Sequence, residues 1–122
     1  MRMVLSYSEV VDKLLDAVPE FENTDKDWNR DLPSDVLGSF ALYLRDRTGT
    51  DSQSLRKSWN FLELMAAAED NDVVDLLVVS VLEVLADEED TAQWARDNMG
   101  TLTSVLFGRV LNGWVGEVKS KL

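Results

Sequence analysis

Apolar residues recur at spacings of three and four along most of the chain, which is the pattern of amphipathic helices. A first helix is predicted over residues 8–18 and must end before Pro19, which cannot continue it. Its apolar stripe consists of Val10, Val11, Leu14, Leu15 and Val18. The next residues, 19–32, are polar and irregular, and we expect Phe21 and Trp28 to anchor them to the core.

Two further helices are predicted in the middle of the chain. Pro33 or Ser34 begins the first of them, since proline suits the first helical turn, and Gly49 is its expected stop. Its apolar positions are Val36, Leu37, Phe40, Ala41 and Leu44. The second begins at Asp51 or Ser52, and its core stripe is Leu55, Trp59, Leu62, Met65 and Ala66.

The segment 72–86 has a mixed pattern. Its many valines favour a strand, whereas its length and the spacing of its polar residues favour a helix. Those polar positions are Asp72, Asp75, Ser80, Glu83 and Asp87. We predict a nearly buried helix with Asn71 as its N-cap.

The last third of the chain predicts a short helix and a longer one. The short helix begins at Asp90 or Thr91 and runs to about Asn98, and Gly100 separates it from the last helix. That helix carries the apolar positions Leu102, Val105, Leu106, Val110, Trp114 and Val118. Its three glycines, at 108, 113 and 116, lower helix propensity and predict a bend or an early end.

These elements predict an all-α protein of about six helices in antiparallel hairpins, either a helical bundle or a short stack similar to helical-repeat proteins. Residues 1–122 are expected to form a single helical domain, since a chain of 122 residues can bury its own core. No sequence period supports a repeat origin.

The charge distribution points to a class of partner. The formal net charge is -11, and no positive charge lies between Lys57 and Arg96. That window holds Glu63, Glu69, Asp70, Asp72, Asp75, Glu83, Asp87, Glu88, Glu89 and Asp90. Such a surface repels nucleic acid and anionic membranes and attracts basic proteins. We therefore expect a partner with a basic surface, and neither nucleic acid nor membrane.

The composition argues against catalysis and bound groups. The chain has no cysteine and no histidine, so thiol chemistry is excluded and the commonest general base and metal ligand are missing. We expect no metal, no cofactor and no enzymatic activity. The apolar run 73–85 is too short and too charged to span a bilayer, and no secretory signal precedes it, so a cytoplasmic protein is expected.

Glu63 and Glu83 interrupt apolar helices and provide the one catalytic alternative. Two facing carboxylates could exchange protons with a substrate. The simpler interpretation is that they line an outer stripe or cap a neighbouring turn, and no nucleophile, phosphate loop or metal set accompanies them.

One face of the 72–86 helix is the main candidate interface. Its two aliphatic residues lie between carboxylates, as in an apolar contact within a charged rim. The face consists of Asp72, Leu76, Val79, Glu83 and Asp87. The alternative is that Leu76 and Val79 are buried beneath the helix at 91–98. The adjoining acidic run 87–90 matches no EF-hand and is typical of a solvated turn.

Trp28 is the best candidate for an exposed aromatic contact, because Asp25, Asp27 and Asp31 surround it in an irregular segment. The alternative is that Trp28 plugs the core from its loop.

Three pieces of sequence carry a resemblance. They are Asp31-Leu32-Pro33 leading into 36–40, the run 61–66, and the segment 72–85 with its Leu-Glu-Val-Leu ending. Over roughly residues 30–115 the chain resembles small acidic all-helical immunity proteins of bacterial polymorphic toxin systems. The resemblance implies an immunity protein that binds and occludes one cognate toxin domain, and it supplies no interface residues. A nuclease is the natural guess for that toxin, because a site that binds nucleic acid must be basic. The rival interpretation is a helical adaptor or assembly subunit, with a homodimer as one form of it.

Overall fold

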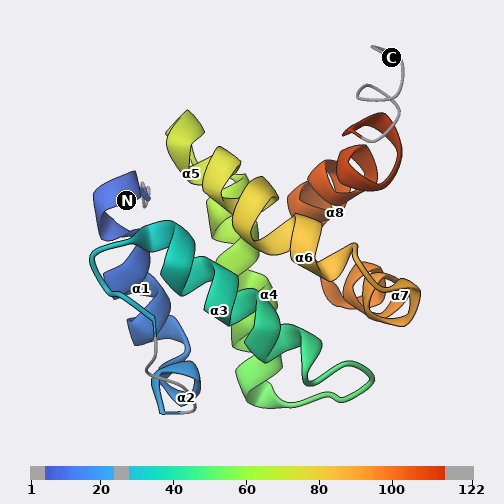
Figure 1. Cartoon of the computed structure of the whole chain (residues 1–122), viewed down its shortest axis with the longest axis horizontal. Coiled ribbons are helices and arrows are strands. Elements are labelled where there is room, and N and C mark those ends of the chain that lie inside the picture. Colours follow the sequence, from blue (N-terminus) through green and yellow to red (C-terminus); the bar gives the residue numbers. More distant parts are fainter. Residues whose placement is uncertain (1–4, 24–27, 115–122) are drawn as a thin grey trace.

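The computed structural model describes residues 5–23 and 28–114, with the side chains of 113 and 114 outside that description. Every regular element within these residues is a helix, and the all-α prediction is confirmed (Figure 1). In chain order the elements are η1 (Tyr7–Glu9), α1 (Val10–Ala17), α2 (Pro19–Glu22), α3 (Pro33–Arg45), α4 (Gln53–Ala66), α5 (Asn71–Leu76), η2 (Leu77–Leu82), α6 (Glu83–Leu85), α7 (Glu89–Asn98), α8 (Thr101–Gly108) and η3 (Arg109–Trp114).

The helix boundaries agree with the predicted local signals. Pro33 occupies the first turn of α3, and Gly49 in the next loop has a φ of 86°, which glycine adopts without strain. The side chain of Ser52 caps α4 by accepting a hydrogen bond from the backbone N–H of Leu55 at 3.2 Å. Helix α7 begins slightly earlier than predicted, with Glu88 at its N-cap.

The segment 72–86 is a helix, as predicted, but with a different cap and an irregular middle. Asp70, not Asn71, is the N-cap, and its carboxylate accepts hydrogen bonds from the backbone N–H groups of Asp72 and Tyr7, both at 3.0 Å. The middle, η2, is a π-helix, in which Glu83 N–H donates to the Val78 carbonyl five residues back. The helix axis continues, but residues after η2 are rotated relative to a regular α-helix.

Consecutive helices fold back on one another around this long helix (Figure 1). Helix α3 packs along η2 and α6, and α4 lies behind them, running back between the end of α3 and the start of α5. Helix α1 packs against α3 and α4 on one side, and α8 packs against α4 and η2 on the other. Helix α7 contacts α6.

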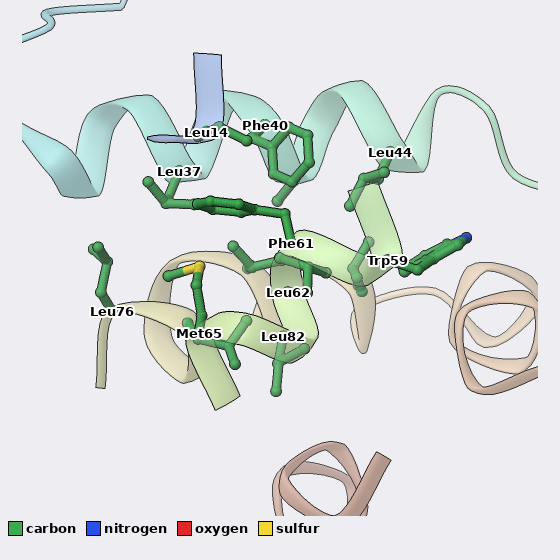
Figure 2. Packing of buried hydrophobic residues seen from close by; sticks show 14 of the residues in the cluster. Leu14, Leu37, Phe40, Leu44, Trp59, Phe61, Leu62, Met65, Leu76 and Leu82 are labelled. Atoms are coloured by element: carbon green, nitrogen blue, oxygen red, sulfur yellow. The ribbon is translucent and has the colours of Figure 1, made fainter. Parts of the chain in front are cut away.

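The core lies where α3, α4 and the α5–η2–α6 helix meet. Figure 2 shows Phe61 of α4 beneath Leu37 and Phe40 of α3, with Met65 and Leu82 farther below. The largest fully buried side chains are Phe21, Phe40, Phe61, Phe107, Leu14, Leu37, Leu44, Leu55, Leu62, Met65, Leu77 and Leu82. Helices from the whole described chain therefore contribute to one cluster.

The predicted core stripe of the last helix is partly wrong. Leu102 and Val105 are 46% and 53% exposed, whereas Thr103 and Phe107 are fully buried and Val110 is 5% exposed. At the start of α8 the buried position is therefore Thr103, a polar residue, and not Leu102. The helix becomes π-helical after Gly108, which agrees with the expected irregularity. The side chain of Trp114, and Val118, lie outside the described residues.

Candidate functional site

The exposed side of α5 and η2 is a ridge with a groove on each flank. The first groove lies between this ridge and the chain's N-terminal part, and its volume is about 400 Å³. Its lining is Tyr7, Ser34, Asp72, Asp75, Leu76, Val79 and Ser80. Polar and apolar groups therefore mix in it.

The second groove lies between the ridge and α8–η3, and we call it the valine groove. Its volume is about 500 Å³, and its lining is Val74, Asp75, Val78, Val79, Leu106, Arg109 and Val110. Five of these seven residues are aliphatic, and the two charged ones, Asp75 and Arg109, lie on opposite walls. Asp75 and Val79 line both grooves and so form the crest of the ridge.

The structure separates the five residues of the predicted face. Asp72 is exposed, and Val79 is 56% exposed, so both are accessible on the ridge. Leu76 is only 6% exposed and belongs to the hydrophobic core, although its edge lines the first groove. Leu76 is therefore buried and Val79 is not, and α7, the helix expected to cover both, packs against α6.

Glu83 and Asp87 do not continue the line of Asp72 and Val79. Glu83 is half-buried in α6, and Asp87 lies in the turn after that helix. Neither of them lines either groove. The π-helix η2 begins before Val79 and ends before Glu83, and its turns shift the register that a regular helical wheel assumes.

Asp75 is the ridge residue that the predicted face omitted. It lies three residues after Asp72 and four before Val79, and residues at these spacings are neighbours on a helix surface. That spacing was the signal that could have placed it on the ridge.

Trp28 is half-buried and packs against the core. Its ring stacks on that of Phe21, with centroids 5.6 Å apart and an interplanar angle of 18°. The side chain is half-buried, and its Nε1 is buried without a hydrogen-bond partner among the described residues. This geometry favours the core-plug alternative. Asp25 and Asp27, two of its acidic neighbours, lie outside the described residues.

Most carboxylates of the acidic window are uncompensated. Asp70 caps α5, and Glu88 lies 3.9 Å from Arg45 in a long ion pair. Within the described residues, no hydrogen bond or ion pair engages the side chains of Glu69, Asp72, Asp75, Glu83, Asp87, Glu89 and Asp90. Their charge is therefore available to a cationic partner.

Glu63 has a structural position that explains its place in an apolar helix. Its carboxylate accepts hydrogen bonds from Leu102 N–H at 2.8 Å, Thr103 N–H at 3.0 Å and Thr103 Oγ1 at 2.8 Å, at the N-terminus of α8. Burial by itself raises the pKa of Glu63, but these three hydrogen bonds together outweigh it and lower the pKa. Glu63 thus caps a neighbouring helix, as the simpler interpretation expected.

The described part of the chain holds neither a metal-binding cluster nor a membrane-spanning helix. Across 5–23 and 28–114, no group of three or more acidic, His or Cys side chains is arranged to hold a metal ion. None of the helices in these ranges has the combined length and hydrophobicity needed to cross a bilayer.

Together, the fold and this surface define an acidic, all-helical domain with a grooved ridge. The chain belongs to the family described as "Domain of unknown function (DUF7674)", which matches it over residues 11–109. That range includes the ridge and nearly all of both grooves. No curated protein and no solved structure matches the chain.

Proposed function

We propose that this protein works by binding, and that its partner is a basic toxin domain whose active surface it occludes, as in the immunity proteins that it resembles. The observation that carries the proposal is the ridge on α5 and η2. There, exposed Val79 lies beside Asp72 and Asp75, whose carboxylates have no partner among the described residues.

The mechanism would combine electrostatic attraction with a desolvated apolar contact. Unpaired carboxylates raise the rate of encounter with a cationic surface, and apolar side chains at the centre slow dissociation. A nuclease fits this chemistry, because a site that binds a phosphate backbone must be positive. Covering such a site would exclude its nucleic-acid substrate. The proposal gives the chain no catalytic role and no cofactor, and it places the protein in the cytoplasm.

The first test is recovery of the partner. The tagged full-length chain is used to capture proteins from its native host at low and moderate salt, with identification by mass spectrometry. The proposal expects one basic protein, such as the toxin domain of a larger chain, whose yield falls as salt rises. Recovery of only this chain, or of the subunits of a standing complex, would contradict it.

The second test measures association with that partner. The variant Asp72→Lys/Asp75→Lys, which reverses the two ridge carboxylates, is expected to slow association about tenfold or more and to weaken its salt dependence. The control, Asp16→Lys/Asp97→Lys, makes the same change in net charge at exposed positions away from the ridge. Equal slowing by both variants would reduce the effect to net charge, and unchanged kinetics would place the interface elsewhere.

A specific observation also favours the adaptor as a second candidate. Leu102 and Val105 are about half exposed and lie three residues apart, so they share one side of α8. An assembly subunit could bury them against a second copy. Sedimentation of the free protein distinguishes the candidates, because a mass that rises with concentration and falls with Val105→Asp supports the adaptor.

A further inference from the structure

We propose that the valine groove binds an amphipathic, positively charged helix of the partner, with aliphatic side chains inserted between the ridge and α8–η3. This inference rests on the proposed function for the class of partner and goes beyond it by naming the groove and the element that fills it.

The shape and lining of the groove support an apolar insertion. Its volume of about 500 Å³ is within the range of ligand sites, and five aliphatic side chains line it. Val79 at its edge remains 56% exposed, so apolar surface is available without rearrangement of the core. Burying that surface under a partner is favourable, because it removes apolar area from water.

The backbone around the groove is unusual on both sides. Val78 and Val79 belong to the π-helix η2, and Arg109 and Val110 belong to the π-helix η3. π-Helical turns are rare, and they occur frequently at functional sites. The presence of one π-helix on each side of the groove supports a functional site there, independently of the groove's charge.

The charges select the occupant. Asp75 on the ridge wall has no ion pair among the described residues, and Asp72 lies on the same ridge, so a cationic face is favoured above the apolar anchors. A second copy of this chain is disfavoured, since it would bring another net charge of -11 to the ridge. The described residues contain no strand whose edge could pair with an extended peptide, and an apolar groove between two helices fits helix-in-groove binding.

Arg109 gives the proposal a distinctive signature. It lies on the opposite wall from Asp75 and has no ion pair among the described residues. A cationic helix in the groove meets attraction from Asp75 and repulsion from Arg109. Reversing the two charges must therefore change affinity in opposite directions.

The probe is a fluorescein-labelled designed helix of about 18 residues, with leucines at i, i+3, i+4 and i+7 spacing and lysines on the other face. Its affinity for the full chain is measured by fluorescence anisotropy. Asp75→Lys is expected to weaken binding about tenfold and Arg109→Glu to tighten it about threefold. Val79→Ser, which removes exposed apolar surface, is expected to weaken binding about threefold.

Matched controls separate the groove from net charge. Asp46→Lys and Arg96→Glu make the same charge changes at exposed positions outside the groove and should leave affinity nearly unchanged. A peptide of the same composition with its leucines scattered around the helix should bind at least tenfold more weakly. If the groove variants change affinity no more than these controls do, or if the scattered peptide binds equally well, the proposal fails.

Further outcomes distinguish this inference from the proposed function. If the peptide binds in the groove but no toxin is recovered from the host, the inference is supported and the toxin-binding function is contradicted. A recovered toxin that binds Asp75→Lys and Arg109→Glu as it binds the unaltered chain would support the function and overturn the inference. A dimer in sedimentation that Val79→Ser dissociates would assign the groove to a second copy and overturn it as well.

Discussion

Glu63 shows how a partly exposed carboxylate in an apolar helix can be explained by its hydrogen bonds. Its charge inside an apolar helix left acid/base chemistry open at the level of sequence. In the structure its two oxygens accept three hydrogen bonds from the start of α8, so the charge compensates N–H groups that the helix itself leaves unpaired. The same contacts fix where α8 lies on α4, which a sequence pattern within α8 does not encode.

Replacing Glu63 by alanine should destabilise the fold. The variant loses a helix cap and leaves Leu102 and Thr103 N–H groups without their acceptor, at a cost of about 1–2 kcal/mol. Urea denaturation followed by circular dichroism measures the loss. Glu69→Ala is the control, since this side chain makes no such hydrogen bond among the described residues and its loss should change stability by about 0.5 kcal/mol or less.

The contribution of Glu63 should also depend on pH. Its folded-state pKa is lowered, so its charge stabilises the fold above the unfolded-state pKa of about 4.3 and this contribution is lost as pH falls through the lower folded-state pKa. The stability difference between the unaltered chain and Glu63→Gln should be constant from neutral pH to about 5 and then shrink. A difference that stays constant down to about pH 3 would contradict the lowered pKa.

A side chain at Gly100 should displace the Glu63 carboxylate from its hydrogen bonds to α8. A Cβ at this position would lie 2.6 Å from Cδ of Glu63, so Gly100→Ala should cost about 1–3 kcal/mol. In the Glu63→Ala background most of this penalty should vanish, and a double-mutant cycle in urea tests that coupling. As a contrast, Gly38→Ala in α3 meets nothing within 4 Å and should stabilise by about 0.5–1 kcal/mol. Additive effects of the Gly100 and Glu63 changes would contradict the contact.

At the scale of elements, periodicity predicted the helices well and their exposed faces less well. The stripes of α1, α3 and α4 are buried as expected because each helix is regular and packs on the core along its length. On the predicted 72–86 face, Asp72, Leu76 and Val79 line the first groove, whereas Glu83 and Asp87 line neither groove, and a wheel at a fixed angle cannot represent the π-helix η2. The α8 stripe was partly wrong because tertiary contacts of Glu63 and Thr103 decide which face turns inward.

The π-helix η2 should tolerate the deletion of one residue. A π-helical turn holds more residues than an α-helical one, so deleting exposed Val79 can return η2 to α-helix and keep α6 in place. Deleting Val74 from α5 instead rotates buried Val73 relative to the later turns of the helix. We expect the first deletion to retain a cooperative urea transition and the second to lose it or shift it to much lower urea. Equal damage from both deletions would argue against a register role for η2.

At the scale of the whole molecule, composition predicted an acidic surface but not the groove in it. The excess of carboxylates indicated an acidic face, and the structure leaves most of those in the 57–96 window unpaired among the described residues. The valine groove could not be predicted, because it forms between segments about 30 residues apart whose packing depends on α4 and Glu63. Asp75 and Arg109 acquire their relation only through that packing.

The same charge excess should make the folded protein sensitive to salt. With 23 acidic and 12 basic residues, compaction brings like charges together, and this repulsion is screened as ionic strength rises. Raising NaCl from about 10 mM to about 0.3 M should stabilise the fold by about 1 kcal/mol, which corresponds to about 4 °C in Tm. Calorimetry at pH 7 measures the shift. The variant Asp72→Lys/Glu83→Lys/Asp87→Lys, with a net charge six units less negative, should start from a higher Tm at low salt and gain less from added NaCl. If salt raised both proteins equally, the gain would come from a general effect of salt on apolar burial, and self-repulsion across this surface would not limit stability.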